Sequence, residues 1–262
     1  MERRAGWQVK RGLPVERWSP SETRRREPAI DGPLRCAFFF PREAQVDNVA
    51  LMQALSRACR RAGVRLLEET VVTRLHVNGG RVRRVQTSRG VLTAPVVVNC
   101  LGSWAGLMRP APAPIPVEPS RGQMLALRGP KRLFRRVVIS DPAYVVQRRD
   151  GRLIVGSTVE RAGFQKALTV EGLQGILRGL RAMSRTAAAC PFLDAWAGLR
   201  PRAPDGLPIL GQGPIEGLYM ATGHFRHGIL LAPITATLMA ELILRHRSPI
   251  DLTPFAPSRF PR

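Results

Sequence analysis

Lysine is nearly missing from this chain of 262 residues. Lys10, Lys131 and Lys166 are the three lysines among 41 basic residues, which leaves 38 arginines against 19 acidic residues and a net charge of +22. A charge of this size is typical of nucleic-acid-binding proteins. The basic residues are scattered, however, and no run alternates them with the aromatic residues that stacking on bases requires. We therefore expect arginine on solvated faces and no specific nucleic-acid partner.

Targeting and membrane segments are also lacking. Residues 1–7 contain no apolar stretch of the kind that a signal peptide needs. The most apolar run, residues 228–244, is interrupted by Pro233, Thr235, Thr237 and Glu241. We therefore expect no membrane span and a cytoplasmic location.

Cysteine occurs four times and never as a C-x-x-C pair: Cys36, Cys59, Cys100 and Cys190. Cys100 follows Val-Val-Val-Asn and Cys190 follows three alanines, so both lie in apolar sequence surroundings. We expect buried, reduced thiols rather than a disulfide framework.

Several catalytic motifs are missing as well. The chain has no Walker phosphate-binding loop and no G-x-S-x-G nucleophile elbow. His224 and His227 have the spacing of half a metal site, but no third or fourth ligand lies nearby in the sequence. We therefore expect no bound metal.

The first part of the chain predicts a strand, a helix and then several short strands. The apolar run at residues 36–40 indicates a strand. Asp47 can cap a helix and Gly63 is suited to end it. The apolar face of this helix consists of Leu51, Leu55, Ala58, Cys59 and Ala62. Short strands are expected at residues 64–67, 71–77, 81–87 and 91–94, with a hairpin turn at Asn78-Gly79.

Residues 96–100 read Val-Val-Val-Asn-Cys and are almost entirely apolar. Such a run indicates a strand that is buried on both faces of a parallel sheet. It ends at Gly102-Ser103-Trp104, a glycine turn at the carboxyl end of the strand. Open α/β sheets bind ligands at this position.

The composition changes at residue 110, where five prolines within ten residues indicate a connection between domains. Residues 121–158 predict several strands, and Asp150-Gly151 marks the turn of the clearest hairpin. The elements expected from that hairpin onward are its two strands, a helix, a turn-rich stretch, a strand and an apolar helix: 144–147, 153–156, 173–183, 196–211, 218–221 and from Gly228 onward.

Residues 221–233 form the most informative segment, because a strand, a glycine turn and a helix start follow one another there. A helix N-terminus offers unpaired N–H groups and partial positive charge. These features suit an anion, or an electron-rich ring such as the pyrimidine edge of a reduced flavin. The residues alone leave an ordinary strand-to-helix connection open as the alternative.

This segment resembles the C-terminal flavin-binding motif of the glycine oxidase and D-amino-acid oxidase superfamily. Four further segments resemble that family in the same order: 41–47 (Pro-Arg-Glu-Ala-Gln-Val-Asp), 97–104, 144–156 and 196–209. Together the five segments cover about residues 36–245. The helix start, Gly-His-Phe-Arg-His-Gly, looks most like glycine oxidase.

The resemblance implies FAD as cofactor and a set of binding residues. The implied cofactor contacts are Val72, Gly102, Trp104, His224, Phe225, Arg226, His227, Gly228, Ile229 and Leu230. The backbone of Val72 would meet the adenine. Arg200 looks like the arginine that holds the substrate carboxylate through its planar fork, with Arg226 and Tyr144 as further substrate contacts. No catalytic side chain and no metal is implied.

The implied reaction is the oxidative deamination of a small, glycine-like amino acid. Hydride passes from Cα to the flavin, the imine hydrolyses to a keto acid and ammonia, and oxygen reoxidises the flavin to give hydrogen peroxide. The resemblance also implies a link to thiamine thiazole synthesis, and it is compatible with a homo-oligomer. A sarcosine oxidase-like or D-amino-acid dehydrogenase-like enzyme is the alternative within the superfamily.

The expected fold is α/β, or α+β overall. It combines a Rossmann-like FAD-binding sheet domain with a second, antiparallel-sheet-and-helix domain that binds substrate. We expect residues 1–40 to join the substrate domain, 41–107 to form part of the FAD-binding domain, 108–195 to form the substrate domain, and 196–262 to return to the FAD-binding domain.

The N-terminal βαβ unit that carries G-x-G-x-x-G in this family has no counterpart in the sequence. Two alternatives therefore stand. One is an oxidase that is active when its N-terminal half is supplied. The other is a truncated, non-catalytic fragment that acts as a basic binding or assembly protein.

Overall fold

The computed structural model describes residues 1–109 and 115–260, which divide into two compact units. Unit 1 consists of residues 1–52, 122–159 and 166–198. Unit 2 consists of residues 53–121, 160–165 and 199–262. The chain thus leaves each unit and returns to it. The assignment of the parts to cofactor and substrate stays a prediction.

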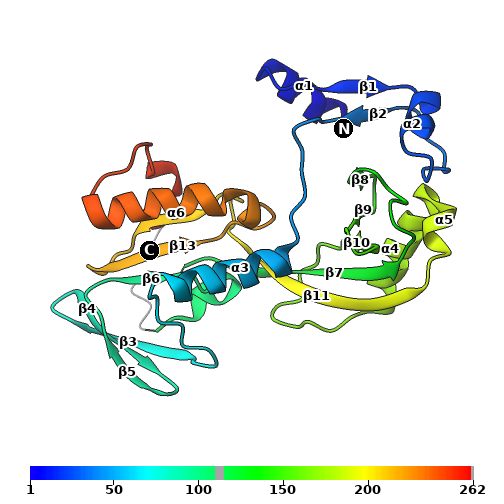
Figure 1. The fold of residues 1–262 in the computed structure, drawn as a ribbon. Coiled ribbons are helices and arrows are strands. Elements are labelled where there is room, and N and C mark those ends of the chain that lie inside the picture. Colours follow the sequence, from blue (N-terminus) through cyan, green and yellow to red (C-terminus); the bar gives the residue numbers. More distant parts are fainter. Residues whose placement is uncertain (110–114, 261–262) are drawn as a thin grey trace. The chain divides into compact units, whose positions relative to one another are not determined.

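Unit 1 begins with four short elements, drawn in blue in Figure 1: α1 (Glu2–Lys10), β1 (Glu16–Trp18), α2 (Pro20–Arg26) and β2 (Ala37–Phe39). The strands β1 and β2 pair antiparallel, and Trp18 stacks on Phe39 with ring centroids 4.7 Å apart. Ser19 caps α2 by accepting a hydrogen bond from the N–H of Glu22 at 3.1 Å.

A five-stranded sheet with the order β11-β7-β10-β9-β8 contributes the core of unit 1. Its strands are β7 (Glu118–Arg128), β8 (Val138–Ile139), β9 (Tyr144–Gln147), β10 (Arg152–Gly156) and β11 (Phe192–Arg202). Helices α4 (Val170–Met183) and α5 (Arg185–Ala188) follow β10. The predicted hairpin is β9–β10, and Gly151 in its turn has φ of +94°.

The helix α4 buries its apolar face against this sheet. Thr169 caps the helix by accepting a hydrogen bond from the N–H of Gly172 at 3.2 Å. Ile176, Leu180 and Met183 pack with Leu125, Leu153 and other strand residues in one buried cluster. The helical spacing predicted from the sequence is confirmed, and it places these residues in the core.

Unit 2 contains a three-stranded meander of β3 (Val72–Asn78), β4 (Arg81–Thr87) and β5 (Gly90–Thr93). The predicted hairpin is confirmed: its two-residue loop is Gly79-Gly80, with φ of +57° and +74°. Two consecutive positive φ values are typical of the tight turn that matches strand twist, and glycine adopts them without steric strain.

A second sheet of unit 2 has the order β12-β13-β6. Its strands are β12 (Ile209–Gln212), β13 (Leu218–Thr222) and β6 (Val97–Asn99), and β6 pairs parallel with β13. The helix α6 (Gly228–Arg245) lies beside this sheet (Figure 1). Short 3-10 turns η1 (Gly102–Leu107), η2 (Thr253–Phe255) and η3 (Pro257–Arg259) complete the unit.

The helix α3 (Asn48–Arg61) follows β2 and begins as predicted. The Asp47 carboxylate accepts hydrogen bonds from the N–H groups of Val49 and Ala50 at 3.0 and 3.1 Å. Gly63 has φ of +76° just after the helix. None of the helix residues is buried, although its apolar face has the expected spacing.

Three expectations about secondary structure and burial are wrong. Residues 64–67 form no strand, because no neighbouring segment pairs with them. The stretch expected to be turn-rich begins inside β11, which extends to Arg202 alongside β7. The strand β6 is not buried on both faces: Val98 is 38% exposed and Cys100 is also exposed, because among the described residues β6 has a single neighbouring strand.

The helix α6 also departs from expectation. It runs through Pro233 without a break, so that 18 residues form one helix that is long and apolar enough to cross a membrane. Only 11% of this stretch is buried. Length and composition alone are weak grounds for a membrane span. The prolines at 110, 112 and 114, expected to connect domains, lie outside the described residues.

Candidate functional site

The N-terminus of α6 lies open to a ligand. His227 is the N-cap and makes no capping hydrogen bond with its side chain. The first helical bond joins the N–H of Leu231 to the carbonyl of His227 at 2.9 Å. Within the part of the chain that the structure describes, the N–H groups of Gly228, Ile229 and Leu230 have no acceptor. These groups and the helix dipole favour a ligand rich in acceptor atoms.

The end of β11 pairs with the turn that precedes α6. The N–H of Phe225 donates to the carbonyl of Pro201 at 2.8 Å, and Arg202 forms a strand-like bridge with His224. The Arg202 guanidinium lies 5.8 Å from the centre of the Phe225 ring. Unit 2 therefore joins the segment of Arg200 to the segment of Arg226, although 26 positions separate them in the sequence.

The turn η1 is tied to the same end of the sheet. The hydroxyl of Thr222, the last residue of β13, donates to the carbonyl of Gly102 at 3.1 Å. Asn99, the last residue of β6, holds the turn from inside, because its side chain bonds the carbonyl of Ala105 and the N–H of Leu101 at 3.2 and 3.1 Å. The carboxyl ends of both parallel strands thus meet, as expected for a ligand site in an α/β sheet.

His224 contributes a hydrogen bond to this site rather than a positive charge. Its Nε2 lies 3.0 Å from the hydroxyl oxygen of Thr235, about two turns inside α6. Partial burial lowers the pKa of the imidazole below its ordinary value of 6.5, since desolvation disfavours the charged form. The ring is therefore neutral at pH 7. It holds the glycine turn against the helix.

The residues at this end of unit 2 fit the acceptor-rich edge of a flavin. The three N–H groups of α6 match carbonyl and ring-nitrogen acceptors. The hydroxyl of Ser103 in η1 is buried and has no hydrogen-bond partner among the described residues, which is costly unless a ligand supplies one. Gly102 has φ of +56° and no atom near the place of a Cβ, whereas Gly223, with φ of +76°, packs against Ile209 and Ala203.

Two predicted residues belong to other elements. Val72 is in β3, and the N–H of Leu75 in the same strand donates to the carbonyl of Arg109, two residues after η1, at 2.7 Å. Tyr144 belongs to β9 in unit 1, where its hydroxyl lies 3.7 Å from the sulfur of Met124. A Cβ at Gly156 would lie 3.0 Å from that hydroxyl, so the glycine leaves room for Tyr144.

Sequence reasoning missed four residues of the site: Arg202, Thr222, Ser103 and Thr235. Arg202 and Thr222 lie next to motif residues, but their contacts arise only when β11 and η1 reach α6. Thr235 was interpreted as an interruption of an apolar run, whereas its hydroxyl holds His224.

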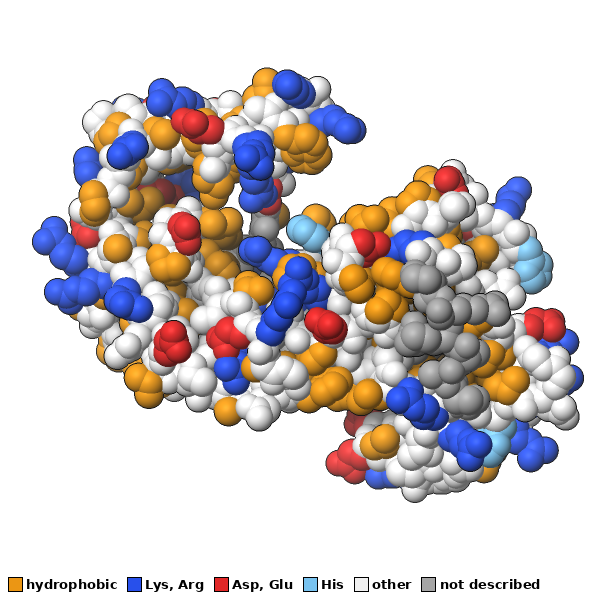
Figure 2. All heavy atoms as spheres, turned by 180° about the vertical axis from the view of Figure 1, so that it is seen from behind, with side chains coloured by type: hydrophobic (Ala, Val, Ile, Leu, Met, Phe, Trp, Pro, Cys, Tyr) orange, Lys and Arg blue, Asp and Glu red, His pale blue; other side chains and the backbone are white. Residues whose placement is uncertain are grey.

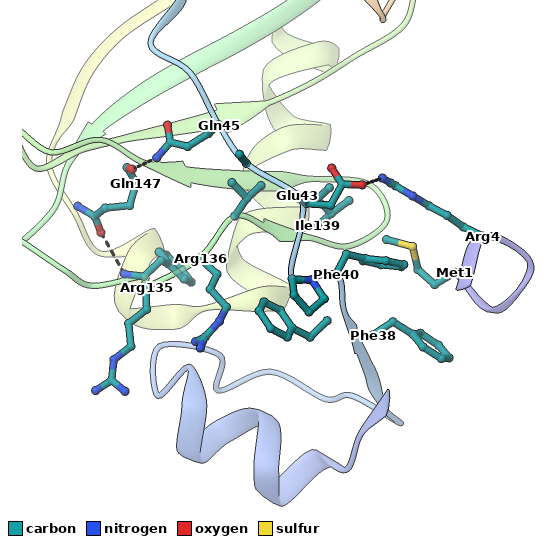
Figure 3. A pocket seen from close by; sticks show the side chains of 15 residues that line it. Met1, Arg4, Phe38, Phe40, Glu43, Gln45, Arg135, Arg136, Ile139 and Gln147 are labelled. Atoms are coloured by element: carbon teal, nitrogen blue, oxygen red, sulfur yellow. Dashed lines mark hydrogen bonds and ion pairs between the residues drawn. The ribbon is translucent and has the colours of Figure 1, made fainter. Parts of the chain in front are cut away.

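Unit 1 has a cavity of about 470 Å³ next to β2 and β8 (Figure 3). Phe38, Phe40 and Ile139 form apolar walls. The Gln45 amide donates to the carbonyl of Gln147 at 2.7 Å and ties the motif segment 41–47 to β9. None of the predicted site residues lines this cavity. Residues of the motif segment, among them Pro41 and Glu43, do line it.

Charge and metal-ligand patterns add no second site. On the face shown in Figure 2, Arg and Lys side chains lie scattered among apolar and uncharged ones. The described ranges, 1–109 and 115–260, hold no group of three or more His, Cys, Asp or Glu residues that could bind a metal ion. The site at the start of α6 is thus the strongest candidate.

A mixed α/β protein with an open helix N-terminus at the carboxyl ends of parallel strands is typical of nucleotide-cofactor enzymes. The model of the DAO family, FAD dependent oxidoreductase, matches residues 1–242. The chain belongs to this family, and the expected fold class is confirmed.

The similar proteins include a bifunctional protein ThiO/ThiG of Trichormus variabilis, 38% identical over 238 residues, which are 89% of this chain and 36% of that protein. Glycine oxidase of Pseudomonas aeruginosa is 32% identical over 96% of this chain and 70% of its own length. The crystal structure of glycine oxidase from Geobacillus kaustophilus matches with a TM-score of 0.93 and 30% identity, over 100% of this chain and 71% of that one. The chain thus spans little more than a third of the bifunctional relative.

Proposed function

We propose that this chain is the larger part of an FAD-dependent oxidase of a small, glycine-like amino acid. The carrying observation is the meeting of β11, η1 and the start of α6 in unit 2, which brings together three segments predicted to serve one site. Membership of the FAD-dependent oxidoreductase family and the likeness to glycine oxidases support the proposal.

The residues of unit 2 would divide the work of binding. The backbone N–H groups of Gly228, Ile229 and Leu230 would hold the flavin edge, and Ser103 would donate to it. Arg200 would bind the substrate carboxylate in a bidentate manner, with Arg226 as a second cation. Tyr144 of unit 1 would be a further substrate contact. When bound, FAD supplies the hydride acceptor that no side chain can provide.

Orientation and exclusion of water would be the protein's part in the reaction. An arginine fork fixes the carboxylate in one plane, so that the Cα–H can be aimed at the cofactor. Because His224 is neutral, it adds no positive charge that would repel Arg226. The product imine would hydrolyse to a keto acid and ammonia, and the similarity to bifunctional ThiO/ThiG proteins supports a link to thiamine thiazole synthesis.

The proposal includes an N-terminal half, outside these 262 residues, that carries the dinucleotide fingerprint. The chain lacks G-x-G-x-x-G, and the glycine oxidase structure that it matches is longer, since the match covers 71% of that chain. The pyrophosphate of FAD needs such a turn at a helix N-terminus. We propose that this N-terminal half supplies it.

The visible spectrum tests the proposal. The purified chain is mixed with FAD, alone and with the part of the Geobacillus kaustophilus glycine oxidase that lies outside the match, and glycine is then added without oxygen. A bound flavin spectrum that bleaches on glycine is expected.

Arg200→Met should lower kcat/KM for glycine roughly 10- to 100-fold, the value of a charged hydrogen-bonded pair. Arg185→Met, at an exposed position of unit 1, is the control.

If the protein retains flavin but glycine does not reduce it, the proposed substrate class is contradicted. Other small amines, first sarcosine and D-alanine, would then be tried in the same cuvette. Equal activity of the Arg200→Met and Arg185→Met proteins would contradict the assigned role of Arg200.

A further inference from the structure

The end of β11 carries two arginines on one face. Side chains alternate between the two faces of a strand, so Arg200 and Arg202 point to the same side, with their backbone positions about 7 Å apart. Pro201 between them fixes the backbone dihedral φ, and its carbonyl accepts the N–H of Phe225 at 2.8 Å. Both side chains therefore start from a rigid segment of unit 2 that is tied to the turn before α6.

The turn before α6 orients the Arg202 side chain. The bond from Phe225 to Pro201 makes the bridge between Arg202 and His224 a non-hydrogen-bonded pair, in which the two side chains lie close on one face. The Arg202 guanidinium lies 5.8 Å from the centre of the Phe225 ring, within the range of a cation–π contact. Phe225 has φ of +49°, a left-handed backbone that a bulky residue rarely adopts, and such strained positions cluster at ligand sites.

The positive charge of Arg202 is not neutralised within the part of the chain that the structure describes. Arg202 is half-buried, and no carboxylate of the described residues forms an ion pair with it. Its bridge partner His224 is neutral at pH 7. Asp205, the nearest acidic residue in the sequence, is held by Arg259, whose Nε donates to the carboxylate at 2.7 Å. A half-buried cation of this kind favours an anionic group of a ligand.

We propose that Arg202 binds a second carboxylate of the substrate, so that the amino acid oxidised at this site is a small amino dicarboxylate such as aspartate. The inference rests on the proposed function, because it takes Arg200 as the residue that holds the α-carboxylate. Arg202 is then a specificity-determining residue, and its planar fork binds the second carboxylate through two parallel hydrogen bonds.

The bonds that change are those of the proposed function. The Cα hydrogen and two electrons pass as hydride to FAD, the amine nitrogen releases one proton, and an imine forms. Water then hydrolyses the imine to a 2-oxo dicarboxylate and ammonia. The second carboxylate takes no part in these steps, so Arg202 acts on binding rather than on hydride transfer.

Binding of inert dicarboxylates to the full 262-residue chain tests the role of Arg202 without any flavin. Succinate has two carboxylates, whereas succinamate has nearly the same shape and only one. Calorimetric titration is expected to show succinate binding at least about tenfold more tightly, the value of one charged hydrogen-bonded pair. Arg202→Met should remove this difference, and Arg202→Lys should restore part of it, because lysine keeps the charge but not the fork. Arg245→Met, at an exposed position near the end of α6, is the control.

Flavin reduction tests the same residue during turnover. The anaerobic assay of the proposed function is repeated with both enantiomers of aspartate and of asparagine, which differ in charge but hardly in shape. For the enantiomer that reacts, kcat/KM for aspartate should exceed that for asparagine at least about tenfold. Arg202→Met, with unchanged circular dichroism, should abolish this preference by raising KM for aspartate while leaving kcat nearly unchanged, as expected when only binding is lost.

Three results would overturn the second-carboxylate site. They are equal or undetectable binding of succinate and succinamate, a loss that Arg245→Met shares, and a loss of FAD affinity in Arg202→Met as large as the loss for succinate. A shared loss would indicate general attraction of anions to a chain of net charge +22. Reduction by glycine without a preference for aspartate would also overturn the site and leave the proposed function in place. Arg202-dependent succinate binding without flavin reduction by any of these amino acids would instead contradict the proposed function.

Discussion

Helices α4 and α6 are both apolar on the side that was expected to pack, yet they differ in what covers them. The shorter helix, α4, buries Ile176, Leu180 and Met183 under the five-stranded sheet of unit 1. The longer and more apolar helix, α6, buries Leu238 and Met239 and exposes most of the rest. Apolar composition therefore makes a helix fit for a core, but a neighbouring surface decides whether it is in one.

The same contrast holds for strands. Val145, Leu153 and Val155 in the middle of the unit 1 sheet are fully buried, whereas Val96, just before β6, and Val98, within it, remain more than a third exposed. Each of the former has strands on both sides, while β6 pairs with one strand among the described residues. The difference shows that similar valine-rich sequence is buried only where neighbouring elements cover it.

The largest expected effect is a core truncation that contrasts the two helices. Leu180→Ala in α4 removes a fully buried side chain and should lower the free energy of unfolding by about 2–5 kcal/mol. Leu244→Ala in α6, where the side chain is 78% exposed, should change it by less than about 0.5 kcal/mol. Urea unfolding measures both. Equal losses would show that α6 is packed as tightly as α4, which would break the comparison.

An ion pair in each unit extends the contrast to charge. Glu27 in unit 1 is 2% exposed, accepts from the N–H of Arg135 at 2.9 Å and pairs with Arg136 at 2.8 Å. Glu27→Ala would remove the buried carboxylate that both donors share and should cost about 1–3 kcal/mol in unfolding free energy.

The control for that variant is Glu69→Ala in unit 2. Glu69 pairs with Arg89 at 3.1 Å, and both side chains are well exposed. Surface pairs of this kind contribute less than about 1 kcal/mol. If both variants lowered the melting temperature by the same amount, the buried ion pair of unit 1 would stabilise the chain no more than the exposed pair of unit 2.

Helix capping should give a smaller difference. Thr169→Ala removes the cap of α4, which also binds the Gln123 amide at 2.9 Å, and should destabilise the chain by about 1 kcal/mol. His227→Ala at the N-cap of α6 breaks no side-chain cap bond and should change stability by less than about 0.5 kcal/mol. Chemical denaturation monitored by circular dichroism compares them, and a larger loss at His227 would argue against an open N-terminus of α6.

The smallest expected effect concerns pH. Burial lowers the pKa of His224 in the folded chain below the ordinary value of 6.5, so the unfolded chain binds a proton before the folded chain does. Stability should therefore fall as pH drops below about 6.5, and His224→Gln should remove part of that slope. Thermal unfolding at pH 7.5 and 5.5 measures it, with His76→Gln as control. If the loss of stability between pH 7.5 and 5.5 is the same in the His224→Gln and His76→Gln proteins, other groups cause the pH dependence.

Local structure was well predicted wherever one short pattern determines it. The hairpin between β3 and β4, the Asp47 cap and the helical spacing of α4 are confirmed, because turns, caps and amphipathic faces depend on residues within a few positions. The turn of that hairpin lies at Gly79-Gly80, one residue beyond the predicted Asn78-Gly79. Residues 64–67 failed because their apolar pattern had no partner strand, and β-structure depends on such a partner.

The candidate site was predicted only in part. The glycine turn and helix start at 223–230 could be predicted from the sequence, because their chemistry is local. The contacts of Arg202 with Phe225, of Thr222 with Gly102 and of Thr235 with His224 could not, because each joins segments brought together by the sheet. The roles of Arg200, Arg226 and Tyr144 stay predictions.

The sequence by itself determined the family resemblance, the arginine-rich charge, the positions of most elements and the helix terminus offered to a ligand. The tertiary structure alone decided which apolar residues are buried, where β6 ends its sheet and which polar groups keep free hydrogen-bonding capacity. The physical reason is that propensity and spacing act over a few residues. Burial and strand pairing depend on neighbours that lie far away along the chain.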